Sequence, residues 1–102
     1  MDLKITKATS AHNQYFKKEI LDQGVGYVVS DRNSIVGLFS YLFIEENKAT
    51  LSFTFVFNMQ AIKLAVETFL KDFPNIQEID YTGNQNLSKI GFNQKIYKRG
   101  DK

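Results

Sequence analysis

Residues 50–73, which read TLSFTFVFNMQAIKLAVETFLKDF, decide the fold. Apolar residues first recur at every second position, which predicts a strand over residues 50–57 whose core face carries Leu51, Phe53, Phe55 and Phe57. From about Gln60 the spacing becomes helical, with one apolar stripe formed by Ile62, Ala65, Val66, Phe69, Leu70 and Phe73. A strand therefore runs almost directly into an amphipathic helix.

The N-terminus of this helix lies just past the strand, near Asn58, Met59 and Gln60. The first N–H groups of a helix lack acceptors within the helix and form the positive end of its dipole. This end can therefore hold an anion. Asn58 is fully explained as an ordinary N-cap, whose side chain accepts a hydrogen bond from the first turn, and this explanation is preferred to a role in phosphate binding.

The composition predicts one small globular domain over residues 1–102, with 43% hydrophobic and 24% charged residues. A net charge of +2 gives no reason to expect binding to nucleic acid or a membrane surface. The chain has no cysteine, and its single histidine, His12, does not form a metal cluster, so no metal site is expected. The first residues lack the apolar run of a signal peptide, and a cytoplasmic location is expected.

The N-terminal half is expected to form a helix and three strands. Residues 3–8 alternate as a first strand, and a helix is predicted from Thr9 or Ser10 to Gln23, burying Tyr15, Phe16 and Ile20. Gly24 suits a left-handed residue that ends this helix. Strands follow at residues 26–30 and 34–44. The second is almost continuously apolar, which predicts a central strand, and Gly37 within it predicts a bulge or a close backbone approach.

The C-terminal half alternates short elements. Pro74 ends the long helix, and a strand is predicted at residues 76–81. Residues 84–90 form a short helix or turn closed by Gly91 and Phe92, and residues 94–98 form a last strand with Ile96 pointing inward. Residues 99–102 are expected to fray. The predicted class is α+β: a mixed, mostly antiparallel sheet of about six strands, flanked by two main helices and one short helix.

This order of elements, together with four short strings, resembles the GNAT superfamily of N-acetyltransferases. The strings are residues 5–9 (ITKAT), residues 31–37 (DRNSIVG), the strand at residues 50–57, and Asn84 followed by residues 89–92 (KIGF). The resemblance covers nearly the whole chain. It implies that acetyl-CoA lies where the fourth and fifth strands separate, and that an amine attacks its thioester.

The resemblance also implies which residues meet the cofactor. Backbone groups of Phe55, Val56 and Phe57 would pair with the pantetheine arm. The pyrophosphate would lie at the loop and first helical turn formed by Asn58, Met59, Gln60 and Ala61. Asn84 and Ser88 would border the other side of the gap. The acceptor would be a small-molecule or peptide amine. A homodimer is a separate expectation, which the resemblance does not supply.

The chain departs from the GNAT pattern in three places. Residues 58–61 contain no glycine, although glycines let the backbone of this loop approach the phosphates closely. There is no room between Gly24 and Gly26 for the second helix that shapes the acceptor site. Leu87 stands where the family commonly has the tyrosine that protonates the leaving thiolate. These departures predict weak or lost activity.

Other candidate side chains have plain structural explanations. Tyr81 and Tyr97 are the candidates for a general acid, but half-buried tyrosines are common in strands. His12 is expected at a surface position of the first helix, and Glu45 and Glu46 at a hairpin tip. A solvated outer helix face is predicted for Lys63, Glu67, Lys71 and Asp72. A loose basic cluster that meets solvent or an anion is formed by Lys89, Lys95, Lys98 and Arg99.

Three hypotheses follow from these observations. The first is a divergent acetyl-CoA-dependent N-acetyltransferase-like protein, supported by the strand that runs into a helix N-terminus. The second is a non-catalytic interaction or regulatory module on the same fold, supported by the missing glycine loop. The third is a ferredoxin-like binding domain, which would require two of the predicted strands to be one.

Overall fold

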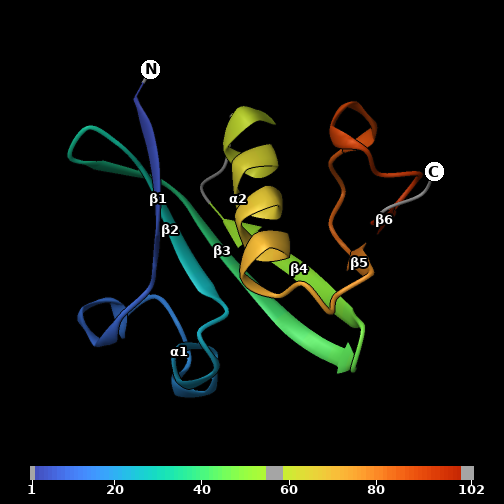
Figure 1. Ribbon diagram of the computed structural model, residues 1–102. Coiled ribbons are helices and arrows are strands. Elements are labelled where there is room, and N and C mark those ends of the chain that lie inside the picture. Colours follow the sequence, from blue (N-terminus) through green and yellow to red (C-terminus); the bar gives the residue numbers. More distant parts are fainter. Residues whose placement is uncertain (1, 55–58, 100–102) are drawn as a thin grey trace.

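The computed structural model describes residues 2–54 and 59–99. In chain order its elements are β1 (Leu3–Lys7), the 3-10 helix η1 (Ser10–His12), α1 (Lys18–Gln23), β2 (Gly26–Asp31), β3 (Ser34–Glu45), β4 (Lys48–Thr54), α2 (Met59–Asp72), β5 (Glu78–Tyr81), the 3-10 helix η2 (Ser88–Ile90) and β6 (Ile96–Lys98). The six strands form one sheet (Figure 1), which confirms the predicted α+β class. The ferredoxin-like alternative is wrong, because no two of the predicted strands merge.

The strands lie in the sheet in the order in which they occur in the chain. Neighbouring strands are antiparallel except β4 and β5, which are parallel. A parallel pair needs a crossover connection, and α2 provides it between β4 and β5. The sheet is therefore mixed and mostly antiparallel, as the sequence predicts.

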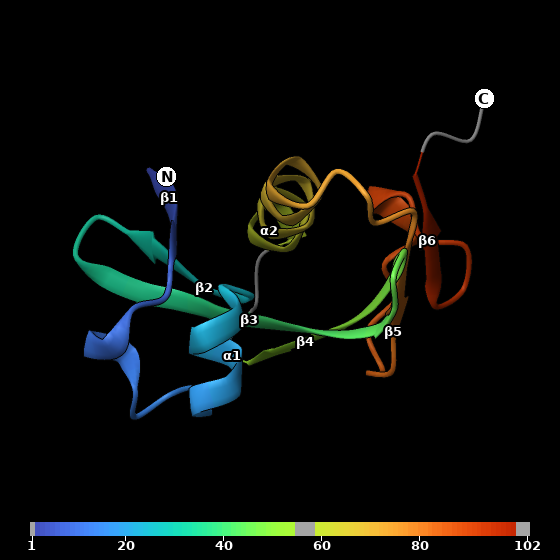
Figure 2. The ribbon, with the colours of Figure 1, turned by 60° about the horizontal axis from the view of Figure 1, so that its bottom comes forward.

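The helices cover the two faces of the sheet unequally (Figure 2). α2 packs on one face, over the main core. η1 and α1 lie on the other face, where a smaller cluster of Ala8, Val28 and Leu38 packs against Phe16 and Leu21. This second layer covers the strands of the N-terminal half only.

The predicted inner face of α2 is confirmed. Its buried residues are Ala61, Ile62, Ala65, Val66, Phe69 and Leu70, while Phe73 is half-buried. The Phe69 ring stacks on Tyr41 with ring centroids 3.6 Å apart, and the Tyr41 hydroxyl donates to the Ala65 carbonyl oxygen at 3.0 Å. On β4, Leu51 is buried and Phe53 is half-buried against the same core. Phe55 and Phe57 lie outside the described residues.

β3 is the central strand that the sequence predicts. Gly37, Leu38 and Phe39 are buried on a strand that pairs with both β2 and β4. The register shifts beside Gly37, because Val29 pairs with Gly37 while Ser30 pairs with Ile35, leaving Val36 as the extra residue. The predicted irregularity is therefore present.

The first helix is shorter than predicted. Residues 9–23 form η1 and the six-residue α1 instead of one helix, and Tyr15 is exposed. Thr9 and His12 form a capping box: His12 Nδ1 accepts the Thr9 backbone N–H at 3.0 Å, and Thr9 Oγ1 accepts that of Ala11 at 3.3 Å. Without a continuous apolar stripe to bury, a fifteen-residue helix lacks the packing that stabilises helices. Gly24 ends α1 in the left-handed conformation, as predicted, with φ of 70°.

The C-terminal elements are also shorter than predicted. β5 begins at Glu78, and the helical segment within residues 84–90 is limited to η2. The predicted closure of this segment is confirmed. Gly91 has φ of 105°, and the N–H of the buried Phe92 donates to the Leu87 carbonyl oxygen at 3.3 Å.

Two predictions about the last strand are wrong. Ile96 pairs with Asp80, whereas Tyr97 pairs with the buried Ile79, so Tyr97 takes the core side and Ile96 stays exposed. Arg99 does not fray. Its guanidinium Nη2 donates to the carbonyl oxygens of Leu70 and Phe73 at the end of α2. Residues 100–102 lie outside the described residues.

Candidate functional site

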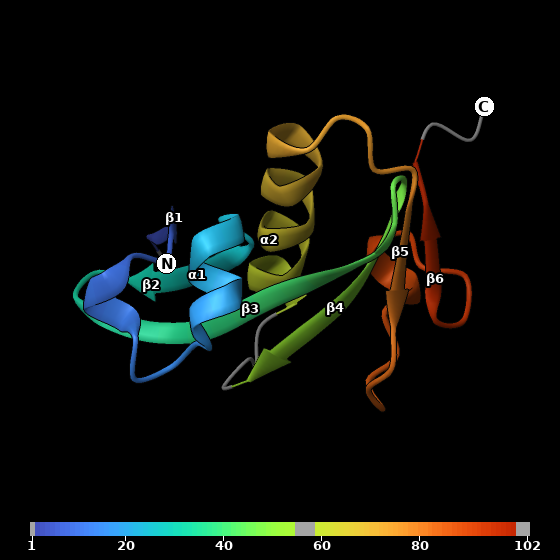
Figure 3. The same ribbon diagram turned by 90° about the horizontal axis from the view of Figure 1, so that it is seen from below.

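β4 and β5 separate at one end of their pairing. Their ladder runs from Lys48 opposite Glu78 to Leu51 opposite Tyr81. β4 continues to Thr54, whereas β5 ends at Tyr81, and the two strands diverge beyond this point (Figure 3). Residues 52–54 therefore have no pairing partner in β5. A separation of the fourth and fifth strands is what the resemblance to the GNAT superfamily implies at this place.

The first turn of α2 lies at the same end of the sheet as the segment that follows β5 (Figure 1). Met59 is half-buried against the core, Gln60 is exposed and Ala61 is fully buried. Phe55, Val56, Phe57 and Asn58 lie outside the described residues, so their roles stay predictions. The N–H groups of the first helical turn have no acceptor within the helix.

The two residues predicted on the other side of the gap lie at the surface. Asn84 and Ser88 are both exposed, in the connection after β5 and at the start of η2. The Ser88 N–H donates to Asn86 Oδ1 at 2.9 Å. Both residues follow Tyr81 in the chain, and their predicted contact with the cofactor stays a prediction.

Of the two candidate tyrosines, Tyr81 is the one that lies beside the gap. Its ring stacks on Phe53 with centroids 5.1 Å apart, and a Cβ added to Gly83 would collide with its hydroxyl. Only 7% of Tyr81 is exposed. Tyr97 lies on β6, where its ring packs against Phe92 and Gly91. Both rings thus have a structural role, and the structure does not bring them together at the gap.

Comparison with known proteins yields matches at the level of structure. No family model and no curated protein matches the sequence. A GNAT family acetyltransferase from Bacillus cereus ATCC 10987 aligns with a TM-score of 0.61 and 17% identity, over 88% of this chain and 79% of that one. A GNAT family acetyltransferase from Elizabethkingia anophelis, solved with acetyl-CoA bound, aligns with a TM-score of 0.50 and 19% identity, over 86% of this chain and 70% of that one.

The chain has a GNAT-like fold. At this level of identity the likeness establishes the fold, and activity must be argued from the site itself. In this GNAT-like sheet, Leu87 is fully buried in the main core. Leu87, where the resemblance leads one to expect a tyrosine, therefore serves packing.

Asp80 was not among the residues singled out from the sequence. It lies on the face of β5 opposite α2, one residue before the gap, and Glu78 occupies the same face two residues earlier. Burial and the neighbouring Glu78 carboxyl raise the pKa of Asp80, while the Lys48 ammonium opposes this shift. Its Oδ1 is buried and finds no hydrogen-bond partner among the described residues. The alternation in residues 78–81 (EIDY) is the signal that could have revealed this carboxyl pair.

The predicted solvated face of α2 is only partly correct. Glu67 is exposed, as expected. Asp72, however, accepts a hydrogen bond from the Tyr27 hydroxyl at 2.9 Å and lies 3.7 Å from Lys7 Nζ. Burial, followed by this hydrogen bond, raises the pKa of the Tyr27 phenol. Asp72 therefore joins α2 to β1 and β2.

The remaining charged candidates lie at the surface, with one exception. Glu45 ends β3 and Glu46 lies in the turn to β4, which confirms the predicted hairpin tip. Lys89, Lys95 and Lys98 are exposed, but Arg99 is turned inward onto α2, so the predicted basic cluster of four does not form as expected.

Within residues 2–54 and 59–99, no group of three or more acidic or histidine side chains could hold a metal ion. No helix in this part of the chain is long and apolar enough to cross a membrane.

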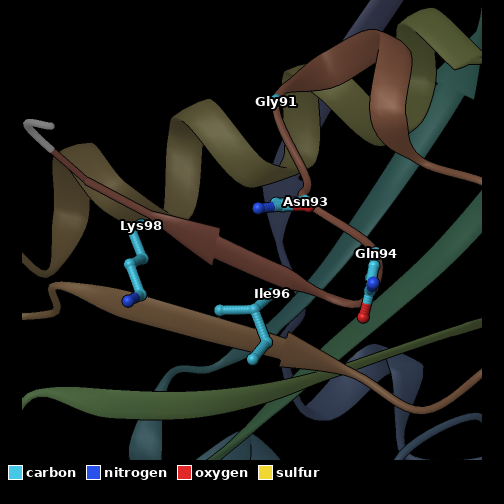
Figure 4. A pocket seen from close by; sticks show the side chains of 5 residues that line it. All are labelled: Gly91, Asn93, Gln94, Ile96 and Lys98. Atoms are coloured by element: carbon cyan, nitrogen blue, oxygen red, sulfur yellow. The ribbon is translucent and has the colours of Figure 1, made fainter.

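Two surface depressions lie away from the gap. One, of about 470 Å³, is lined by Gly91, Asn93, Gln94, Ile96 and Lys98 (Figure 4). The other, of about 460 Å³, lies between η1 and α1 and is lined by Thr9, Ser10, Asn13, Phe16, Lys18, Leu21 and Asp22. Neither includes a residue of the predicted cofactor site, and the sequence analysis predicted neither depression.

Proposed function

We propose that this chain binds acetyl-CoA in the gap between β4 and β5 and is an N-acetyltransferase-like protein with weak or lost activity. The observation that carries the proposal is the end of the β4–β5 ladder at Leu51 and Tyr81, beyond which β4 continues without β5. A strand edge freed in this way offers backbone donors and acceptors to an extended ligand. The pantetheine arm, which is amide-rich, is such a ligand.

The groups around the gap fit the cofactor only in part. Backbone groups of residues 52–57 would hold the pantetheine arm, and the first turn of α2, at Met59, Gln60 and Ala61, would meet the pyrophosphate. Ala61 is fully buried, and no glycine occurs in residues 58–61. Fewer N–H donors can therefore approach the phosphates. Losing two of them, at about 1.5–3 kcal/mol each, weakens binding at least about a hundredfold.

Catalysis is expected to be slow or absent. Bound acetyl-CoA would supply an activated thioester, which an amine attacks directly. The chain's contribution would be to position that thioester and to protonate the leaving thiolate. Tyr81 is almost wholly buried, and the Leu87 side chain has no ionisable proton to donate. These two positions therefore offer a poor general acid. The proposal includes a small-molecule or peptide amine as acceptor and a cytoplasmic location.

A titration followed by heteronuclear NMR tests the cofactor proposal. Acetyl-CoA should shift the amide signals of residues 59–62 first, with a dissociation constant in the high micromolar range or weaker, in keeping with the loss of phosphate donors. Gln60→Glu adds a negative charge at the proposed phosphate position and should weaken binding several-fold. Gln77→Glu adds the same charge at an exposed position between α2 and β5 and serves as the matched control.

The titration also has a decisive negative outcome. If millimolar acetyl-CoA leaves these amides unmoved, the cofactor proposal fails. Equal effects of Gln60→Glu and Gln77→Glu would show that binding depends on overall charge and not on the helix N-terminus.

The second candidate function is a non-catalytic interaction module on the same fold. One observation favours it: Leu42, Phe43 and Ile44 are consecutive on β3 and are 56%, 40% and 51% exposed. Three adjacent exposed apolar residues are unusual on a folded domain unless they serve a contact. Loss of the cofactor proposal would make this function the leading one.

A further inference from the structure

The face of the sheet opposite α2 is only half covered. Phe16 and Leu21, the latter in α1, pack over Val28 and Leu38 in the N-terminal part of the sheet. Among the described elements, no helix lies over this face of β4, β5 and β6, or over the end of β3 (Figure 2). Leu42 and Ile96, at the two sides of this uncovered area, are 56% and 40% exposed.

The strand register arranges this uncovered face in two rows, each crossing β3, β4, β5 and β6. The first row contains Leu42, Thr50, Asp80 and Ile96, so its two ends are apolar and its middle is polar. The charged row contains Glu45, Lys48, Glu78 and Lys98. Lys48 Nζ lies 3.5 Å from Glu78 Oε2, and Ile96 and Lys98 project from the same side of β6 (Figure 4), so these four side chains share one face. Glu45 is the residue of β3 that pairs with Lys48, just after a register shift that leaves Ile44 as the extra residue.

When either row is turned end to end and placed against itself, the side chains that face each other are complementary. We propose that a second copy of this chain packs on this face, about a two-fold axis that runs parallel to the strands between β4 and β5. Such an axis reverses each row. Leu42 then faces the partner's Ile96, and Thr50 faces the partner's Asp80. In the charged row, Glu45 faces the partner's Lys98, and Lys48 faces the partner's Glu78.

The charges of the second row also disfavour other ways of packing two copies face to face. In the proposed register, all four positions of the row meet the opposite charge. A displacement by one strand places Glu45 against the partner's Glu78, which is repulsive. A two-fold axis perpendicular to the strands, between the rows, places Asp80 against the partner's Glu78, which is also repulsive. Like charges that face each other across an interface suppress alternative pairings.

The physical basis is ordinary sheet packing. Two sheets can pack face to face with their strands within about 30° of each other, with side chains of the facing surfaces in contact. Here the contact would cover the exposed side chains of Leu42 and Ile96, whose burial is favourable. The charged row would lie beside them at the edge that carries the β3–β4 hairpin. An interface of this kind is isologous, since the same surface is used twice.

Charge exchange gives a specific test of this pairing. Sedimentation equilibrium of the full chain should show a concentration-dependent dimer. Lys98→Glu places a carboxylate against the partner's Glu45, and Glu45→Lys places an ammonium against the partner's Lys98. Each single variant should raise the dimer dissociation constant by about tenfold or more, because the like-charge contact occurs twice in the dimer.

The double variant Glu45→Lys with Lys98→Glu should restore dimerisation, since the two charges are exchanged across the interface. Within one copy these residues lie on β3 and β6, about 14 Å apart at the usual strand spacing, so restoration cannot arise from contact within one chain. Lys63→Glu, on the exposed outer face of α2, is the matched control and should leave the dimer unchanged.

A substitution at Leu42 tests the row that contains Leu42 and Ile96. Leu42→Asp should give a monomer with the parent's dispersed amide spectrum, because Leu42 is exposed and contributes little to the core of one chain. The proposal is overturned if the parent chain remains monomeric at millimolar concentration. It is also overturned if the dimer survives Lys98→Glu, or if the double variant stays as weak as the single ones.

Discussion

The Arg99 guanidinium closes the C-terminal end of α2, because its Nη2 donates to the Leu70 carbonyl oxygen at 2.7 Å. The same nitrogen reaches the Phe73 carbonyl oxygen at 3.1 Å, and Nε reaches that of Ile76 at 2.6 Å. The last carbonyl groups of a helix have no partner within the helix, and a cation there also meets the negative end of the dipole. The end of β6 is thereby tied to the helix across the core.

Arg99→Ala should destabilise the domain by about 2–3 kcal/mol, because it leaves half-buried carbonyl groups without their charged donor. Urea unfolding followed by circular dichroism measures this loss. Lys89→Ala, which removes an exposed cation of η2, should leave the midpoint unchanged. An Arg99→Ala midpoint equal to that of the parent would mean that the C-terminal segment does not hold α2 in solution.

Phe69→Ala should cost about 3–5 kcal/mol, because Phe69 is fully buried and stacks on Tyr41. For a domain of this size that is a large share of the total stability. Tyr41→Phe removes only the hydroxyl that donates to Ala65 and should cost about 1 kcal/mol. Thermal unfolding of both variants and the parent measures the two losses in stability. Equal losses would show that the stacked pair is not the centre of the core.

Lys63→Ala and Glu67→Ala should each change the stability by only a few tenths of a kcal/mol, because exposed charge pairs contribute little. Urea unfolding at low protein concentration tests this expectation. A loss above about 1 kcal/mol at Glu67 would place the outer face of α2 in an interface. That result would compete directly with the dimer surface proposed on the opposite side of the sheet.

Asp80→Asn should make the domain more stable than the parent at neutral pH. The folded-state pKa of Asp80 is raised above the ordinary value of 3.8, so ionising this carboxyl costs stability as the pH rises through the folded pKa. Below the ordinary value both states are protonated, and the difference between variant and parent should shrink. Urea unfolding at pH 3 and pH 7 measures this trend. A variant that loses stability specifically at pH 7 would show that attraction to Lys48 outweighs burial.

Features that depend on neighbouring residues could be predicted well. The alternation in β4 and the helical spacing in α2 identified the buried faces. The period of a strand or helix determines which side chains project from the same face of it. Gly24 and Gly91 were recognised as helix ends because the left-handed conformation favours glycine. The β4–β5 ladder ends at Leu51 and Tyr81, where the resemblance to the GNAT fold implies that the two strands separate.

Features that depend on distant parts of the chain could not be predicted. Whether Ile96 or Tyr97 faces the core depends on the register between β5 and β6, and a shift of one residue exchanges the two faces. The partners of Arg99 and Asp72 lie on other elements, so their sequence neighbours carry no signal for them. The first helix was overestimated because packing, which the local pattern does not contain, decides whether a weak helix forms.

The sequence by itself thus determined the α+β class, the six strands and the inner faces of α2 and β4, because these follow from the periods of the backbone. Only the tertiary structure decided which side chains of different strands stand in one row. The alignment of Glu45, Lys48, Glu78 and Lys98 across the open face arises from three strand pairings between residues up to thirty positions apart. Such pairings are chosen by the whole core, since the register that buries the most apolar surface is the one that forms.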